Sequence, residues 1–364
     1  MFRSVGFLAV TIAVLAVREQ IHAAQSEAKF VGSIGCKSSS CHGGAGEKRS
    51  QYITWSQKDF HTRAYAILLD ARSARIAEAL NITQPQTSAR CTVCHSPFQS
   101  VAPDRLISTA RIDEGVSCEN CHGAAEPWLR GHTRTDWTYA TRVSAGMHDL
   151  RNIYVRANAC VACHQNVDAD ILKAGHPELV FELDGQSVNE PKHWRDEDPA
   201  SGPRSWLVGQ GVALREIAWA VSKAAPEQGE RNQLFAQMSA LTWLLDKTPL
   251  GKSVNEISSY PGIQLRADEI AQESAKWNPT RDELMSILQT LAASDSEFQS
   301  NSSGDHHFYR ALRLTLALDR LSAALNLGSK LEKELSALRT DVQRHYDFDT
   351  AAFTGHLRAL RAKL

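Results

Sequence analysis

The spacing of apolar residues predicts a helical bundle in the C-terminal part of the chain. Apolar positions recur there with a helical period, and the loops between them are short. The expected helices cover residues 212–224, 230–246, 281–293, 308–325 and 330–346, with a shorter one over 350–364. In the helix over 308–325, Leu314, Leu318 and Leu321 share one apolar face. Phe308 lies on roughly the opposite face, so this helix is expected to pack between neighbours in an antiparallel bundle.

Upstream of this bundle the pattern is different. Long periodic runs are scarce, and Cys, His, Gly and Ser are frequent. Two helical stretches are expected, over residues 51–69 and 73–80. Three prolines, Pro191, Pro199 and Pro203, and the charged run at 195–198 indicate a linker or an exposed crossing segment. We therefore expect a first domain at residues 29–195, a linker at 196–208 and a helical domain at 209–364, in a fold that is mainly α with much irregular structure.

Residues 1–24 have the pattern of a secretory signal peptide. Arg3 supplies the positive charge, and Val5–Val17 is an apolar stretch of thirteen residues, followed by small residues at Ala23 and Ala24. A membrane span needs about 20 apolar residues, so this stretch is too short to cross comfortably. We expect an exported protein, periplasmic or in an equivalent compartment, that is soluble or tethered by an uncleaved N-terminal anchor.

Charge and cysteine content narrow the range of functions. The 364 residues include 40 Lys and Arg against 41 Asp and Glu, which gives a net charge of -1 and argues against a nucleic-acid partner. All eight cysteines lie between Cys36 and Cys163, and the remainder of the chain contains none. The cysteine chemistry is therefore confined to the N-terminal half.

Three cysteine pairs lie in the sequence motif C-x-x-C-H, which is the attachment signature of c-type haem. They are Cys91, Cys94 and His95; Cys118, Cys121 and His122; and Cys160, Cys163 and His164. Two thiols one helical turn apart add to the two vinyl groups of one haem, and the following imidazole reaches its iron. Zinc ribbons do not require that His, and a disulfide oxidoreductase uses one such pair beside a βαβ pattern, which is not visible here.

The two remaining cysteines form a fourth, longer motif. Cys36 and Cys41 are separated by four residues, and His42 follows directly. Four haems then use all eight cysteines, so we expect four covalently bound c-type haems with iron. Their proximal ligands are expected to be His42, His95, His122 and His164.

The second axial position on each iron must come from elsewhere in the chain. Five histidines of the cysteine-rich region lie outside the motifs: His61, His132, His148, His176 and His193. Methionine is scarce in this region, so the supply favours bis-His iron. We rank His148 below the other four candidates, and we interpret the C-terminal histidines, His306 and His307 included, as solvated helix residues.

These motifs resemble a known family. The matching elements are Gly35 to Gly44 around the first motif, Trp55 with 59–65, Gly115 to Gly123 around Cys118, and 174–177. Together they are similar to the tetrahaem c-type cytochromes related to cytochrome c-554. The resemblance implies a compact, largely irregular haem domain with closely packed haem pairs, mostly bis-His iron and a periplasmic location. It also implies that the redox partners are other cytochromes or a membrane quinone-linked complex. The region from about residue 209 lies outside it.

Three functions remain open from the sequence. The first is an electron carrier, because four haems bound within so short a chain must lie close together. The second is a haem enzyme that reduces or oxidises a small nitrogen or sulfur species at one open-coordinate iron. The third is a subunit of a larger complex that docks through its C-terminal helices. No catalytic residue is assigned.

Overall fold

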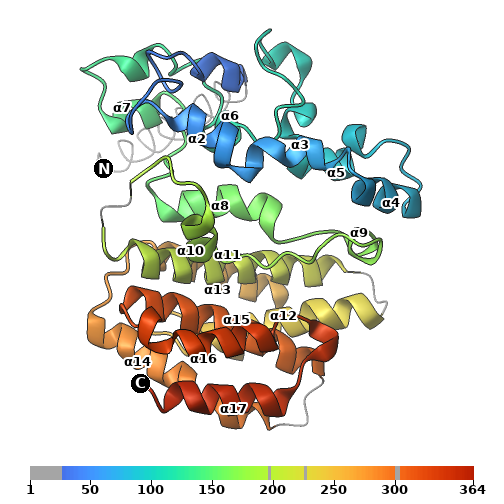
Figure 1. Ribbon diagram of the computed structural model, residues 1–364, viewed down its shortest axis with the longest axis vertical. Coiled ribbons are helices and arrows are strands. Elements are labelled where there is room, and N and C mark those ends of the chain that lie inside the picture. The colour runs from blue at the N-terminus through green and yellow to red at the C-terminus, as the bar shows by residue number, and fades with distance from the viewer. Residues whose placement is uncertain (1–26, 196–197, 225–227, 300–303) are drawn as a thin grey trace, which may run out of the picture. The chain divides into compact units, whose positions relative to one another are not determined.

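The computed structural model describes residues 27–195, 198–224, 228–299 and 304–364 (Figure 1). In these residues the chain is mainly helical, and its β-structure is limited to one isolated bridge between Phe30 and Leu106. This confirms the expected fold class. The proposed signal peptide, 1–24, lies outside the described residues. Within them, no helix is both long enough and apolar enough to cross a membrane.

The chain forms two compact units that meet in sequence between Leu150 and Arg151. The first unit contains short helices joined by irregular segments. Its α-helices are α2 (Gln51–Lys58), α3 (Ala64–Ile67), α4 (Ala71–Ala79), α5 (Ala89–His95), α6 (Cys118–His122) and α7 (Tyr139–Ser144). Its 3-10 turns are η1 (Ser33–Cys36), η2 (Phe60–Arg63), η3 (Pro85–Thr87), η4 (Pro97–Ser100), η5 (Pro103–Arg105) and η6 (Gly131–Thr133).

The prediction of one continuous helix over residues 51–69 is wrong. The segment is divided into α2, η2 and α3. Asp59 has an extended backbone, and its carboxylate accepts a hydrogen bond from the backbone nitrogen of His61 at 2.9 Å. This capping ends α2 and starts η2, because an aspartate side chain competes with the helix for backbone donors. The helix expected over 73–80 is confirmed as α4.

The second unit holds the C-terminal bundle. Its α-helices are α8 (Ile153–His164), α9 (Ala169–Lys173), α10 (Leu183–Asn189), α11 (Ser201–Lys223), α12 (Gln228–Asp246), α13 (Tyr260–Ser274), α14 (Arg281–Ala292), α15 (Gly304–Ala324), α16 (Gly328–Asp341) and α17 (Thr350–Arg361). Its 3-10 turns are η7 (Val254–Glu256), η8 (Ser294–Phe298) and η9 (His345–Asp347). The six helices expected in the bundle are present, whereas α8, α9, α10 and α13 were not predicted.

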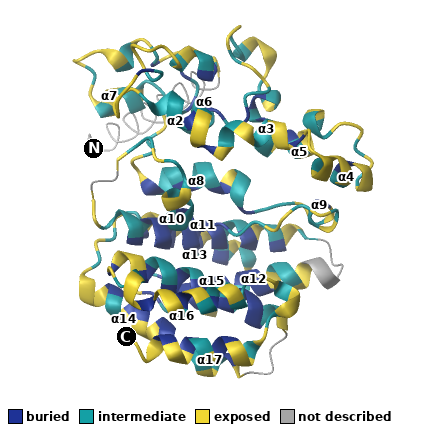
Figure 2. Ribbon diagram, viewed as in Figure 1, coloured by how far each residue is buried: buried dark blue, intermediate teal, exposed yellow. Residues whose placement is uncertain are grey.

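Helix α15 packs between neighbours, as its two apolar faces predicted. Leu314 and Leu318 are fully buried, and Phe308 is buried on the other side. The helix contacts α11, α12, α14 and α16. Figure 2 shows the buried residues concentrated on the facing sides of these bundle helices. A large apolar core therefore runs through the second unit, and Phe308 belongs to a smaller cluster with Ala236, Ala240 and Tyr309.

The linker expected at 196–208 is wrong over its second half. Helix α11 begins at Ser201, and Trp206, Leu207 and Val208 are buried in the bundle core. Pro203 lies in the first turn of α11, where a missing N–H costs no helical hydrogen bond. Pro199 and Pro203, which suggested a linker, therefore lie at the start of α11, the longest helix among the described residues.

The first domain expected at 29–195 is divided by the fold. Ile153, Ala157 and Val161 of α8 are buried in the same cluster as the core of the bundle. Residues 151–195, with the fourth cysteine motif, therefore belong to the same unit as the cysteine-free helices. The physical reason is the apolar face of α8, which repeats every four residues and packs against α11.

Candidate haem-binding site

The three short motifs lie at the ends of helices. They form the last turns of α5 and α8 and the whole of α6. Each helix places its two cysteines three residues apart, on adjacent turns of one face. Helix α6 has only five residues, and the side-chain oxygen of Asn120 accepts a hydrogen bond from the backbone nitrogen of Ser117 at 2.6 Å at its N-terminus. The asparagine between the cysteines therefore has a structural role in the motif.

The longer first motif is an ordered loop. The backbone nitrogen of His42 donates to the carbonyl of Cys36 at 3.2 Å, which brings the two ends of the motif together. A Cβ atom on Gly43 would lie 1.8 Å from the carbonyl oxygen of Lys37. Only glycine fits this close approach. The loop thus offers two thiols and an imidazole, like the helical motifs.

Two of the motifs lie side by side in the first unit. The thiols of Cys36 and Cys118 interact. This interaction lowers the pKa of Cys36, and together with burial it raises the pKa of Cys118 well above its usual value. The first attachment points of the first and third motifs are therefore in contact.

Glu119, inside the third motif, connects these two motifs through the backbone. Its carboxylate is buried and accepts hydrogen bonds from the backbone nitrogens of Val31 at 3.0 Å, Gly32 at 2.7 Å and Ala125 at 2.6 Å. Val31 and Gly32 directly precede η1, which ends at Cys36. Sequence reasoning missed this role, because the donors lie up to 88 residues away.

His61 lies beside the third motif. Its carbonyl accepts a hydrogen bond from the backbone nitrogen of Val116 at 3.0 Å, and a Cβ atom on Gly115 would approach the same oxygen to 2.5 Å. The Nδ1 atom of His61 is 3.0 Å from the carboxylate of Asp59. Such carboxylate–histidine pairs orient metal-ligating imidazoles in proteins. Asp59 lies in the segment 59–65 that carries the family resemblance, but its contact with His61 was not predicted.

His42 and His132 face each other in the first unit. Their ring centres are 6.0 Å apart, and the ring planes differ by 17°. With metal–nitrogen bonds of about 2 Å on each side, two imidazoles that share one metal have ring centres roughly 6 Å apart. Burial lowers the pKa of His132, and the neighbouring His42 lowers it further, which favours the neutral form that binds iron. The separation of the two ring centres therefore matches that of two imidazoles on one metal.

Five of the candidate histidines share one hydrogen-bonding pattern. Their Nδ1 atoms contact acceptors: Gln51 for His42, Ala64 for His95, Leu129 for His132, Cys121 for His148 and Pro177 for His176. Ligand histidines typically use one ring nitrogen in this way and bind the metal through the other. The donor set of the chain therefore suits iron.

The apolar surface of the first unit also suits a flat cofactor. Its largest buried apolar cluster is small and centres on Val31, Ala125 and Trp128. Large apolar side chains are exposed in the same unit, namely Phe60, Ile67, Leu69, Val93 and Ile112. Val93 lies between the two cysteines of the second motif. Apolar side chains around the attachment motifs are the surroundings that a macrocycle needs.

The fourth motif and two candidate ligands belong to the second unit. Burial raises the pKa of Cys160 on α8 to about 11, so its sulfur lies in apolar surroundings. His176 follows α9, after Gly175, which has a positive φ of 109°. The ring of His193 contacts that of Trp194 at 5.2 Å, and Arg156 of α8 lies over the same indole at 5.7 Å.

The remaining histidines are placed as follows. His148 lines a cavity of about 360 Å³ together with Gly123. His345 and His356 pair with Asp305 and Asp341 at partly exposed positions, in agreement with a role at the surface. The expectation for His307 is wrong, because its side chain is buried on α15.

Comparison with known proteins supports the haem interpretation for part of the chain. Residues 35–123 match the family model described as cytochrome c554 and c-prime. The comparisons with curated proteins and with solved structures found no match. The matched segment contains the first three motifs, together with His61. Residues 35–123 are thus similar to a cytochrome c554-related family of c-type cytochromes, in which haem is attached covalently through cysteine.

Proposed function

We propose that the chain is a tetrahaem c-type cytochrome that transfers electrons between redox partners through closely packed, mostly bis-His haems. The cysteines that would bind haem are Cys36 and Cys41, Cys91 and Cys94, Cys118 and Cys121, and Cys160 and Cys163. The proximal ligands would be His42, His95, His122 and His164. The supply of thiols and imidazoles supports four haems, because each motif provides both attachment points and one axial ligand.

The His42–His132 pair carries this proposal. We infer that these two imidazoles bind opposite faces of the first haem, with His42 proximal and His132 distal. The separation of 6.0 Å and the anchored Nδ1 atoms support this assignment. An iron with two protein ligands has no position for substrate, and such a haem acts as a carrier.

The distal ligands of the other three haems would come from His61, His176 and His193, with His148 ranked below them. The Asp59 carboxylate beside His61 supports that residue in particular. His176 and His193 share the second unit with the fourth motif.

The haem supplies reversible one-electron chemistry at iron, and the residues of this chain set its conditions. The acceptors at Nδ1 of His42, His95, His132, His148 and His176 hold these imidazoles in one orientation and increase their basicity. Helices α5, α6 and α8 present their thiols at fixed spacing. The contact between Cys36 and Cys118 supports a short path between the first and third haems, and a short path is what rapid electron transfer requires.

We further propose that the protein is exported and that its partners are other cytochromes or a membrane quinone-linked complex. The signal-like pattern at 1–24 and the attachment of c-type haem support export. The near balance of 40 basic and 41 acidic residues gives no support to a nucleic-acid partner.

Carbon monoxide binding distinguishes a carrier from an enzyme. Electron paramagnetic resonance of the oxidised holoprotein should show low-spin iron only, and reduced protein should show no shift of its Soret band under carbon monoxide. A high-spin signal together with one haem that binds carbon monoxide would overturn the carrier assignment. That result would support the alternative, a reductase or oxidase of a small nitrogen or sulfur species.

A further inference from the structure

The cysteine-free helices hold the fourth attachment motif at two polar contact sites. We propose that this bundle positions the fourth haem, and that Arg215 and Tyr309 are positioning residues that act through α8 and through the loop after His176. The proposal rests on the function above, because it requires a haem at Cys160 and Cys163. It assigns a role to the helices that lie outside the family match.

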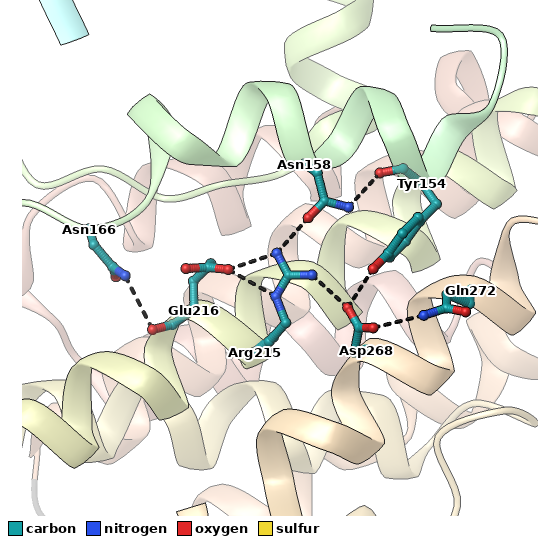
Figure 3. Close-up of polar contacts among 7 residues, drawn as sticks. All are labelled: Tyr154, Asn158, Asn166, Arg215, Glu216, Asp268 and Gln272. Atoms are coloured by element: carbon teal, nitrogen blue, oxygen red, sulfur yellow. Dashed lines mark hydrogen bonds and ion pairs between the residues drawn. The ribbon is translucent and has the colours of Figure 1, made fainter. Parts of the chain in front are cut away.

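The first contact site joins α8, α11 and α13 (Figure 3). Arg215 of α11 donates to the side-chain oxygen of Asn158 on α8 at 2.6 Å and to the carboxylate of Asp268 on α13 at 2.5 Å. The hydroxyl of Tyr154, also on α8, donates to the same carboxylate at 2.7 Å. One guanidinium therefore connects the attachment helix to two bundle helices.

This arrangement resists movement of α8 along the bundle. The side chains of Arg215 and Asp268 are partly buried, so their ion pair is less screened than a fully exposed one. The planar guanidinium makes contacts in fixed directions, which a point charge does not. Asn158 lies two residues before Cys160 on the same helix, so any sliding of α8 would move the cysteines and His164 as one rigid group.

The second contact site anchors the chain after His176. Glu178, two residues further on, accepts hydrogen bonds from the hydroxyl of Tyr309 at 2.8 Å and from the amide of Gln237 at 2.5 Å. Tyr309 is buried on α15, and Gln237 lies on α12. Arg313 of α15, which is also buried, donates to the backbone carbonyl of Phe181 at 2.7 Å.

Both contact sites therefore act on groups that a haem would use. The first fixes the helix that carries two thiols and the proximal imidazole. The second fixes the loop that carries a candidate distal imidazole. Orientation of axial ligands and their hydrogen bonds tunes the reduction potential of haem iron. The cysteine-free bundle would thus set the coordination of one haem of the four.

Variants of the full-length holoprotein test this proposal. Arg215→Gln removes the charged, planar guanidinium, and Tyr309→Phe removes one hydroxyl while keeping the buried ring. Redox titration followed optically should show a shifted potential for one haem and unchanged potentials for the other three. The electron paramagnetic resonance g-values of that haem should change as well. Arg215→Lys retains the charge but not the planar guanidinium. Its potential should therefore lie between those of the Arg215→Gln and wild-type proteins.

Arg358→Gln is the matched control. This residue pairs with Asp295 and links α17 to η8, within the same bundle but away from residues 151–189. Its loss should leave all four potentials unchanged. Unchanged potentials in both the Arg215→Gln and Tyr309→Phe proteins, or an equal shift in the Arg358→Gln protein, would overturn the positioning role. Fewer than four haems in the wild-type protein would instead overturn the function on which it rests.

Discussion

Individual side chains in the first unit are held by partners that are distant in sequence. His132 meets His42 across 90 positions of the chain, and Glu119 binds the backbone of Val31 across 88. The haem-attachment role of the cysteines and proximal histidines could be predicted from local sequence motifs. The pairing of distal ligands could not, because any of five histidines can reach an iron until the fold places them.

Replacement of His132 by Ala should convert one haem from low spin to high spin. The variant removes the imidazole that faces His42, and alanine offers no ligand for the vacated axial position. Electron paramagnetic resonance and the optical spectrum of the ferric protein measure the change. His356→Ala is the control, because that imidazole pairs with Asp341 in the bundle. A fully low-spin spectrum for His132→Ala would contradict the ligand assignment.

Glu119→Gln should destabilise the protein by about 2–3 kcal/mol. The carboxylate accepts hydrogen bonds from three backbone nitrogens, whereas an amide would turn its own donors toward some of them. The free energy of unfolding in urea, followed at the Soret band, measures the loss. Glu256→Gln, at an exposed site, should change it by no more than about 0.5 kcal/mol. Equal stability of the two variants would rule out this role for Glu119.

Secondary-structure elements in this chain form where local capping and distant packing agree. The apolar period predicted six helices of the bundle, and the Asp59 cap divided one helix that periodicity alone had joined. Helix α13 was missed, because its buried face includes the small residues Ala267 and Ala271, which give a weak periodic signal. Helix α10 depends on a buried cap, Glu182, whose side chain accepts hydrogen bonds from two backbone nitrogens of its first turn.

Glu182→Gln should flatten the pH dependence of stability between about pH 4.5 and 7. Burial raises the pKa of Glu182 to about 7, above its ordinary value of 4.5. In this window the native state binds more protons than the unfolded state, so the free energy of unfolding falls as pH rises. The full effect is roughly 3 kcal/mol for such a shift.

Urea unfolding of wild type and of Glu182→Gln across pH 4.5 to 8 measures this difference. The wild-type protein should lose stability through the window, and the variant should lose less, since an amide does not titrate. Glu256→Gln, at an exposed site, serves as the control and should follow the wild type. A parallel decline in the Glu182 variant would show that another group causes the dependence.

At the scale of the whole chain, each of the two units contains both cysteine chemistry and structural helices. The first three motifs lie in one unit, and the fourth lies with the bundle. Composition suggested a boundary near residue 196, because no cysteine follows Cys163 and the prolines and the charged run lie near that residue. Packing placed it after Leu150, because the apolar face of α8 completes the core of the bundle.

A haem count tests the stoichiometry directly. The pyridine haemochrome assay on purified holoprotein should give four covalent haems per chain. Replacement of Cys36 and Cys41 together by Ser should reduce the count to three, because the first motif then offers no thiol. The same double change at Cys160 and Cys163 should also give three. A wild-type count of three that the Cys36 and Cys41 change leaves unaltered would exclude a haem at the first motif.

The sequence by itself determined the helical class of the chain and the local groups from which haem attachment is predicted. Both follow from spacing over a few residues, which is set by the helical period and by the reach of two thiols and one imidazole. Only the tertiary structure decided that His132 faces His42, that Cys36 contacts Cys118 and that Arg215 holds α8. These contacts join residues tens of positions apart, and such contacts depend on how whole elements bury their apolar faces together.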